Sequence, residues 1–154
     1  MPHALNLTMK IKQDAETQAE LKHLVETFAT TLQPKIDAAL RESRKVHSAR
    51  LVVIDNLYLQ VLTVYDGDHL AYTEFFRKKL PDVFAKLFSL AEAPPAASSM
   101  GNPDAFFTFA SGLQRRSLGE SDTGELGQDK LSEGYLFSAY GKLEVQDILP
   151  KLDM

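Results

Sequence analysis

The sequence predicts a single α+β domain built on an antiparallel sheet. Three observations indicate this class: an alternating apolar pattern near the start, two adjacent β-rich runs in the middle, and apolar residues at helical spacing elsewhere. The chain has 154 residues, of which 44% are apolar and 25% charged. That length and composition fit one globular domain over residues 1–154 with a core of its own.

The strands are predicted from period-two patterns. Leu5, Leu7, Met9 and Ile11 alternate with polar residues, which is typical of a strand with one apolar face. Residues 49–55 and 58–65 are rich in β-branched and aromatic residues and are joined by Asn56-Leu57, which predicts a hairpin. Leu57 is poorly suited to a two-residue turn because such a turn needs positive φ angles. A longer loop, with a different register, therefore remains open.

The helices are predicted from apolar spacing and from capping residues. Between Leu21 and Leu40 the apolar residues recur every three or four positions, and Pro34 within this run predicts a kink or a junction of two helices. Three further helix starts are indicated by Asp68, by Pro81, and by Asn102 followed by Pro103. Residues 93–99 are predicted to be a linker.

The last third of the chain is predicted to be less regular. Residues 117–134 are polar and contain four glycines, which favours a mobile surface loop. Residues 135–140 are predicted to form a short aromatic strand, and residues 145–149 a terminal turn of helix. The resulting order, β-α-β-β-α-(α)-β, is the ferredoxin-like pattern with an extra helix before the last strand.

Two segments also resemble a known group of proteins. Residues 46–55 (VHSARLVVID) and 65–72 (YDGDHLAY) are similar to segments of uncharacterised bacterial proteins of the dimeric α+β barrel superfamily, over roughly residues 44–90. The resemblance implies a ferredoxin-like fold that pairs as a homodimer. It implies little about function, because that superfamily includes cofactor-free oxygenases, haem-degrading enzymes, dye-decolourising peroxidases and lactone isomerases. The peroxidase signature Gly-x-x-Asp-Gly is absent, so peroxidase chemistry is not expected.

Composition and motifs exclude several classes of function. The chain has no cysteine, which excludes disulfides and thiolate chemistry, and its net charge of −4 argues against nucleic-acid binding. No apolar run is long enough to cross a membrane, and no signal peptide is evident, so we expect a cytoplasmic protein. Phosphate-loop and hydrolase motifs are missing. The four histidines show no ligand spacing, so no metal site is predicted, and no cofactor is indicated.

The hairpin predicts where a ligand would bind. With Asn56-Leu57 as the turn, one face of the hairpin carries Ser48, Arg50, Val52, Ile54, Leu59, Val61, Thr63 and Tyr65. Because the helices cover only one side of the sheet, this apolar face would be bare, which predicts sheet-to-sheet dimerisation. The polar groups of Arg50, Thr63 and Tyr65, joined by Asn6 and Thr8 from the first strand, are the predicted ligand-binding residues.

A second cluster is a weaker candidate for catalysis. In this register His47 faces Asp66, with His69 nearby, and a histidine beside a carboxylate can act as a general base. The same pair could be a structural salt bridge. Two functions follow: a dimer that binds a small lipophilic or aromatic molecule, as a cofactor-free or haem-linked oxidoreductase, or a non-catalytic binding or stress-related dimer whose barrel is filled by side chains.

Overall fold

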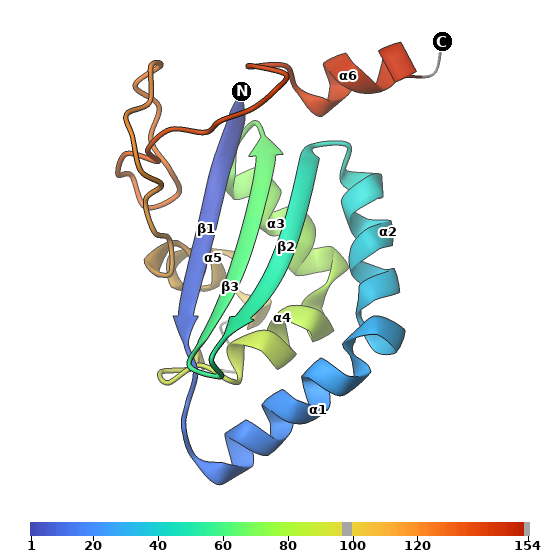
Figure 1. Ribbon diagram of the computed structural model, residues 1–154, viewed down its shortest axis with the longest axis vertical. Helices are drawn as coiled ribbons and strands as arrows, with labels where there is room; N and C mark the ends of the chain where they lie inside the picture. Colours follow the sequence, from blue (N-terminus) through green and yellow to red (C-terminus); the bar gives the residue numbers. More distant parts are fainter. Residues whose placement is uncertain (97–99, 153–154) are drawn as a thin grey trace.

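A computed structural model describes residues 1–96 and 100–152 and shows a mixed α+β fold. Its strands and helices follow one another along the chain (Figure 1): β1 (Pro2–Lys10), α1 (Ala15–Thr31), α2 (Gln33–Ser43), β2 (Val46–Ile54), β3 (Tyr58–Asp66), α3 (His69–Lys79), α4 (Pro81–Phe88), α5 (Pro103–Gly112) and α6 (Val145–Leu152). None of the described helices is long and apolar enough to cross a membrane.

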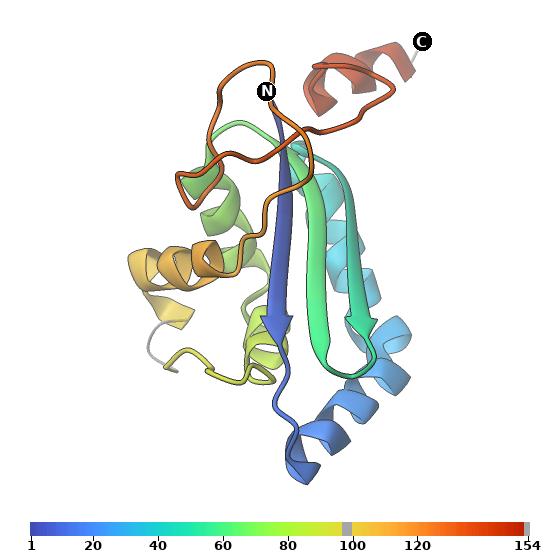
Figure 2. The ribbon, with the colours of Figure 1, turned by 60° about the vertical axis from the view of Figure 1, so that its left-hand side comes forward.

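The three strands form one antiparallel sheet in the order β1-β3-β2. Figures 1 and 2 show α2, α3, α4 and α5 on one side of this sheet, while the other side carries no helix along most of its length. The exposed edge of β1 is covered by residues 113–115, since Thr8 N donates to Leu113 O and Arg115 N donates to Asn6 O, at 2.9 and 2.8 Å. This short segment therefore runs where a fourth strand would lie.

The core lies between the sheet and the helices. The inward-facing side chains of β1, Leu5, Leu7 and Met9, are buried, as expected from their alternation. Helices α4 and α5 contribute Leu87, Phe88 and Phe106, and the rings of Phe88 and Phe106 lie 5.7 Å apart. These aromatic residues are thus mainly core residues. Replacing a buried Phe with Ala typically lowers the free energy of unfolding by about 3–5 kcal/mol.

The predicted hairpin is present, but its predicted register is wrong by one residue. Ile54 pairs with Tyr58, so the loop has three residues. Asp55 and Asn56 take the positive φ angles, 52° and 58°, and Leu57 N donates to Ile54 O at 2.9 Å. Because Asp and Asn tolerate left-handed backbone far better than Leu does, the turn forms one position earlier than predicted. The shift moves the alternate residues of β3 to the opposite face.

The helix starts predicted at Asp68, Pro81 and Asn102 are confirmed, as is a junction of two helices near Pro34. Helix α1 ends at Thr31 and α2 begins at Gln33, with Pro34 in its first turn. Asp68 caps α3 by accepting from Ala71 N, Pro81 opens α4, and Asn102 caps α5 by accepting from Ala105 N. In the predicted linker, residues 93–96 have no helix or strand, and residues 97–99 lie outside the described part of the chain.

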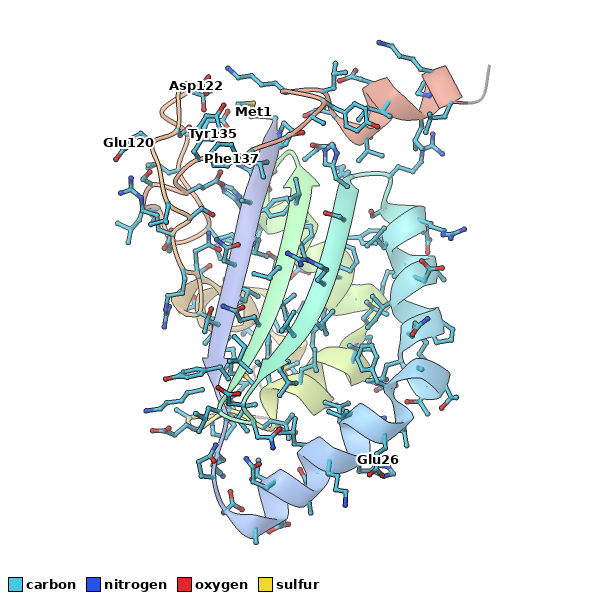
Figure 3. All side chains as sticks on the ribbon, in the orientation of Figure 1. Met1, Glu26, Glu120, Asp122, Tyr135 and Phe137 are labelled. Carbon is cyan, nitrogen blue, oxygen red and sulfur yellow. The ribbon has the colours of Figure 1, made fainter. Side chains whose placement is uncertain are left out.

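Near the C-terminus, one prediction is confirmed and one is wrong. The predicted terminal helix is present as α6, but residues 135–140 form no strand. The middle of the β1 edge is already taken by residues 113–115, and the aromatic rings of Tyr135 and Phe137 pack 4.8 Å apart on the surface. Phe137 is 84% exposed, so the segment buries no apolar face that would favour pairing with the sheet. Figure 3 shows both rings near Met1, beside the start of β1.

Candidate functional site

The face of the sheet without helices, here called the helix-free face, holds only part of the predicted ligand site. The ladder gives it Ala4, Asn6, Thr8 and Lys10 from β1, Ser48, Arg50, Val52 and Ile54 from β2, and Tyr58, Gln60, Leu62 and Val64 from β3. Arg50, Asn6 and Thr8 are therefore brought to one face. Arg50 is exposed and forms no ion pair among the described residues, while Asn6 Nδ2 bonds Ser117 Oγ at 2.8 Å.

Thr63 and Tyr65 lie on the opposite face, under the helices. Both are buried, and Thr63 Oγ1 lies 3.1 Å from the hydroxyl of Tyr72 in α3. The rings of Tyr65 and Tyr72 stack at 3.9 Å. Burial raises the pKa of Tyr72 to about 12 and that of Tyr65 further still, so both phenols stay protonated. The predicted five-residue site around Arg50 is thus divided by the sheet.

A cavity of about 370 Å³ lies at the end of the helix-free face where the C-terminal segment crosses it. Its walls are mostly apolar and come from the ends of the three strands, from residues 136–140 and from α6; they include Pro2, Val46, Val64, Phe137, Tyr140, Val145, Ile148 and Leu149. The polar groups among its walls are His47, Ser48 and Ser138. An apolar hollow of this size with a few convergent polar groups is typical of a small-molecule site.

A β-bulge places His47 in the wall of this cavity. Val46 pairs with Tyr65 and Ser48 pairs with Val64, so His47 is an extra residue in β2. Without the bulge, neighbouring residues of a strand would point to opposite faces; with it, both His47 and Ser48 line the hollow. Bulges often redirect side chains at functional sites.

His47 is held by a buried carboxylate, as the sequence indicated. His47 Nε2 lies 2.7 Å from Asp66 Oδ1, and the other oxygen of Asp66 accepts from Val145 N at 2.7 Å. Asp66 is 4% exposed, so its charge is kept from water and depends on these two donors. The carboxylate fixes the proton on Nε2. The Nδ1 atom of His47 has no hydrogen-bond partner in residues 1–96 and 100–152 and can accept a proton.

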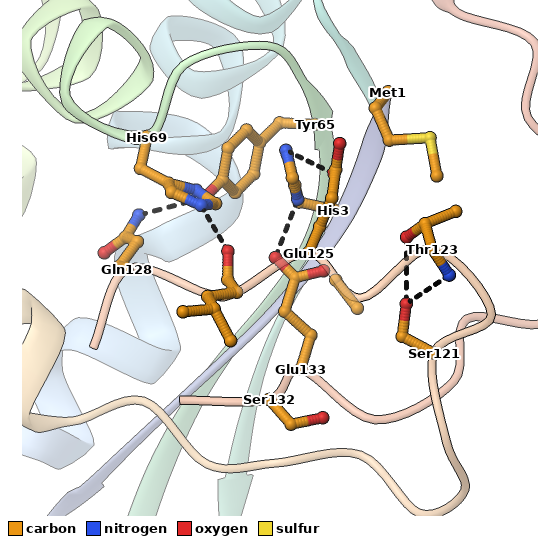
Figure 4. A network of polar contacts seen from close by, with 12 residues as sticks. Met1, His3, Tyr65, His69, Ser121, Thr123, Glu125, Gln128, Ser132 and Glu133 are labelled. Carbon is orange, nitrogen blue, oxygen red and sulfur yellow. Dashed lines mark hydrogen bonds and ion pairs between the residues drawn. The ribbon is translucent and has the colours of Figure 1, made fainter. Parts of the chain in front are cut away.

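His69, the third catalytic candidate, belongs to a different cluster (Figure 4). Its Nδ1 lies 2.5 Å from the hydroxyl of Tyr65, and its Nε2 lies 2.7 Å from the carbonyl oxygen of Leu126. A carbonyl only accepts, so the proton is on Nε2, and Tyr65 donates to Nδ1. Gln128, also buried, approaches the Tyr65 hydroxyl at 3.4 Å. His69 is thus separate from the His47–Asp66 pair.

The same cluster contains a histidine that the sequence did not single out. His3 Nδ1 lies 2.7 Å from Glu133 Oε1, and the rings of His3 and His69 are 4.4 Å apart. Ligand atoms of His3, His69 and Glu133 all lie within 4.8 Å of one another, which makes these the residues able to hold a metal ion. They come from β1, from the start of α3 and from residue 133, so no local spacing could show them.

Two other hollows differ in character from the cavity beside His47. A groove of about 730 Å³ between α1 and α4 is larger, but its charged residues, Glu16, Glu20, His23 and Lys86, are all exposed at its rim. A polar hollow of about 280 Å³ lies over the loop and is lined in part by Glu125 and Glu133. Among the hollows lined by described residues, only the cavity beside His47 combines apolar walls with a histidine that is held by a buried carboxylate.

Comparison with known proteins gave no match: no family model fits the chain, and neither a curated protein nor a solved structure is significantly similar to it.

Proposed function

We propose that the protein binds a small, largely apolar molecule in the cavity of about 370 Å³ beside His47, and that His47 exchanges a proton with it. The observation that carries this proposal is the buried Asp66 carboxylate, which orients a histidine in the wall of an otherwise apolar hollow. A carboxylate that fixes one imidazole nitrogen leaves the other as a base or acid toward a bound molecule. Ser48 and Ser138 supply hydroxyls that can orient a polar group of the ligand.

The cavity wall favours a particular class of ligand. Phe137 and Tyr140 contribute aromatic rings, and α6 contributes Ile148 and Leu149. Such walls fit an aromatic or branched apolar ring bearing one hydrogen-bonding group. The ring would pack against α6 while its polar group faced His47. No Asp, Glu, Lys or Arg side chain is among the described residues that line the cavity, so a neutral ligand fits better than a charged one.

We also propose that the chain works as a homodimer of the ferredoxin-like type. Two surfaces support a second copy as the partner. The helix-free face is half polar in the observed register, but its Ile54 and Tyr58 are each 38% exposed, and none of the residues of the amphipathic helix α6 is buried, with Leu152 71% exposed. In a two-fold pair each copy would cover both surfaces of the other. In this proposal, residues 113–117 take the place of the last strand of the ferredoxin-like pattern.

A screen of small aromatic fragments tests the proposed binding. We would record two-dimensional amide NMR spectra of the full chain with each fragment. The proposal predicts saturable shifts at Ser48, Val64 and Phe137, which lie in the cavity wall. Shifts confined to the groove between α1 and α4, or no saturable shift with any fragment, would count against it.

The test of proton exchange uses the matched variants His47→Gln and His23→Gln. For a fragment that carries an ionisable group, the pH dependence of its affinity should change in His47→Gln, because the proton acceptor is lost. His23 is exposed on α1 and remote from the cavity lining, so His23→Gln should keep the wild-type profile. An unchanged profile in both variants would leave His47 a purely structural partner of Asp66.

A further inference from the structure

We infer that His3, His69 and Glu133 form a binding site for a divalent transition metal ion, independent of the proposed small-molecule cavity. Two imidazoles and one carboxylate are a recurrent ligand set for zinc and for non-haem iron. His3 is 6% exposed, and the side chain of Glu133 is 11% exposed, so the ligands are drawn together away from bulk water. The pair His3 Nδ1–Glu133 Oε1, 2.7 Å apart, shares a proton that a metal ion could replace.

Each histidine has an outer partner that fits this role. His69 Nε2 donates to Leu126 O at 2.7 Å, which leaves the lone pair on Nδ1 for a metal ion. His3 Nε2 lies 3.6 Å from a carboxylate oxygen of Glu125, which can accept its proton once Nδ1 binds the ion. Metal-bound histidines typically donate their second ring nitrogen to a carbonyl or carboxylate in this way.

Of two buried groups next to the ligands, one lacks a hydrogen-bond partner and the other would lose its partner to the ion. Tyr65 donates to His69 Nδ1, the atom that the ion would take. The side-chain oxygen of Gln128 is buried without a hydrogen-bond partner among the described residues, and its amide nitrogen lies 3.4 Å from the Tyr65 hydroxyl. A half-turn of this amide gives up the contact of its nitrogen with Thr73 Oγ1, at 3.3 Å, and presents its oxygen to the Tyr65 hydroxyl, so Tyr65 keeps an acceptor when the ion binds. The unpaired oxygen thus has a use in the metal-bound state.

The site is also open on one side. Glu125 and Glu133 line the polar hollow of about 280 Å³ that faces solvent. Three protein ligands with an open side are the arrangement of metal sites that keep a position for water or a substrate, rather than of closed structural sites. Imidazole and carboxylate donors without thiolate favour zinc, iron, cobalt or nickel over softer ions.

Titration calorimetry with Zn²⁺ on the untagged chain at neutral pH tests the inference, and the visible absorption of Co²⁺ reports the coordination. We expect one equivalent of Zn²⁺ to bind with release of protons. Glu133→Gln should weaken binding by at least about tenfold, and Glu125→Gln by roughly tenfold, as outer partners do. Glu120→Gln is the matched control: Glu120 lies in the same loop and pairs only with Arg116, so its loss should leave the affinity unchanged.

Any of three results would overturn the inference. The first is that the wild-type chain binds no stoichiometric Zn²⁺ or Co²⁺. The second is that Glu133→Gln binds as tightly as the wild type while His23→Ala does not, which would place the ion on α1. If Glu133→Gln fails to fold by circular dichroism, Glu125→Gln decides, because its side chain is 42% exposed and its change should not unfold the chain. An unchanged affinity in that variant also overturns the inference.

Discussion

Asp66 joins three separate parts of the chain through one carboxylate. It holds His47 at the β2 bulge, belongs to the end of β3, and accepts from the first amide of α6. Because the carboxylate is buried, each lost donor or acceptor leaves a desolvated group unpaired. The same residue therefore orients the proposed proton acceptor and fixes the C-terminal helix that closes the cavity.

Replacing Asp66 with Asn should lower both stability and fragment binding. Asn offers one acceptor oxygen and one donor nitrogen where Asp offers two acceptors. If its oxygen accepts from Val145 N, its nitrogen can only donate to His47 Nε2, which moves the imidazole proton to Nδ1 and removes the proposed proton acceptor. We expect a loss of about 1–3 kcal/mol in the free energy of unfolding, measured by urea denaturation. The matched control is Asp68→Asn, two residues along: Asn caps a helix as well as Asp does, so the change should stay within about 0.5 kcal/mol. Equal effects of the two changes would contradict the role given to Asp66.

The stacked Tyr65–Tyr72 pair predicts a loss of stability in alkali. Because burial raises the pKa of both phenols, the folded protein keeps these protons over a pH range in which the unfolded chain loses them. Stability is therefore fully present below the ordinary tyrosine pKa of 10.0 and falls as the pH rises through about 12. Each group can contribute a slope of up to roughly 1.4 kcal/mol per pH unit in that window. Urea unfolding between pH 9 and about 11.5 should show this fall, and it should be shallower in Tyr72→Phe; an identical slope would refute the account.

At the scale of elements, the local signals of the sequence are the ones that the structure confirms. The helix starts depend on contacts within one turn. Asp68 and Asn102 each accept from the amide nitrogen three residues later, so the capping residue and its partner lie close together in the sequence. The register of the hairpin depends on which two residues take positive φ angles. These are Asp55 and Asn56, and not Asn56 and Leu57 as predicted. The bulge at His47 has no signal in the sequence, because it arises from the way β2 meets β3.

The edge of β1 shows why the last strand was misplaced. Residues 113–115 hydrogen-bond to Asn6 and Thr8, although nothing in their sequence is typical of a strand. Tyr135 and Phe137 have high strand propensity, but they lie beside β1 (Figure 3), where residues 113–115 already occupy the middle of the edge, and they have no core to pack on. High strand propensity leads to a strand only where the segment can also pair with a sheet edge and pack its side chains.

The loop over residues 117–134 should be cleaved unevenly by a glutamate-specific protease. Glu120 has a side chain that is 85% exposed, whereas Glu133 is bonded to His3 and 11% exposed. We expect early cleavage after Glu120 and Glu125 and late cleavage after Glu133, followed by mass spectrometry. In His3→Ala the Glu133 site should become an early one, because its anchor is gone. Early cleavage after Glu133 in the wild type would show that the loop is not anchored there.

At the scale of the whole molecule, the proposed dimer should be sensitive to charge on the helix-free face. Sedimentation should give about twice the chain mass for the wild type. Leu62→Asp places a carboxylate at the centre of that face, directly opposite Arg50. Because burying this ion pair at an interface removes both charges from water, the variant should yield monomers. Val25→Asp, on the exposed side of α1 and away from the proposed interface, should leave the dimer intact. A monomeric wild type, or a dimer that Leu62→Asp does not weaken, would contradict the proposed interface.

The ligand site could be predicted only in part for the same reasons. The His47–Asp66 contact followed from their positions at neighbouring strand ends. The cavity did not, because it needs α6 and residues 136–140, which are far along the chain. The cluster of His3, His69 and Glu133 was missed because its members are brought together only by the folded β1, α3 and loop.

The proposed binding site is best tested by the affinity of the tightest-binding aromatic fragment for a matched pair of variants, Val64→Phe and Val52→Phe. Both valines lie on the helix-free face, but only Val64 lines the cavity. Both substitutions should affect the dimer to a similar extent. Only the ring added at residue 64 should fill the cavity. We predict that Val64→Phe weakens binding by at least about tenfold, about 1.4 kcal/mol, and that Val52→Phe leaves it near the wild-type value. Equal affinities in the two variants would contradict the proposal that this cavity is the binding site.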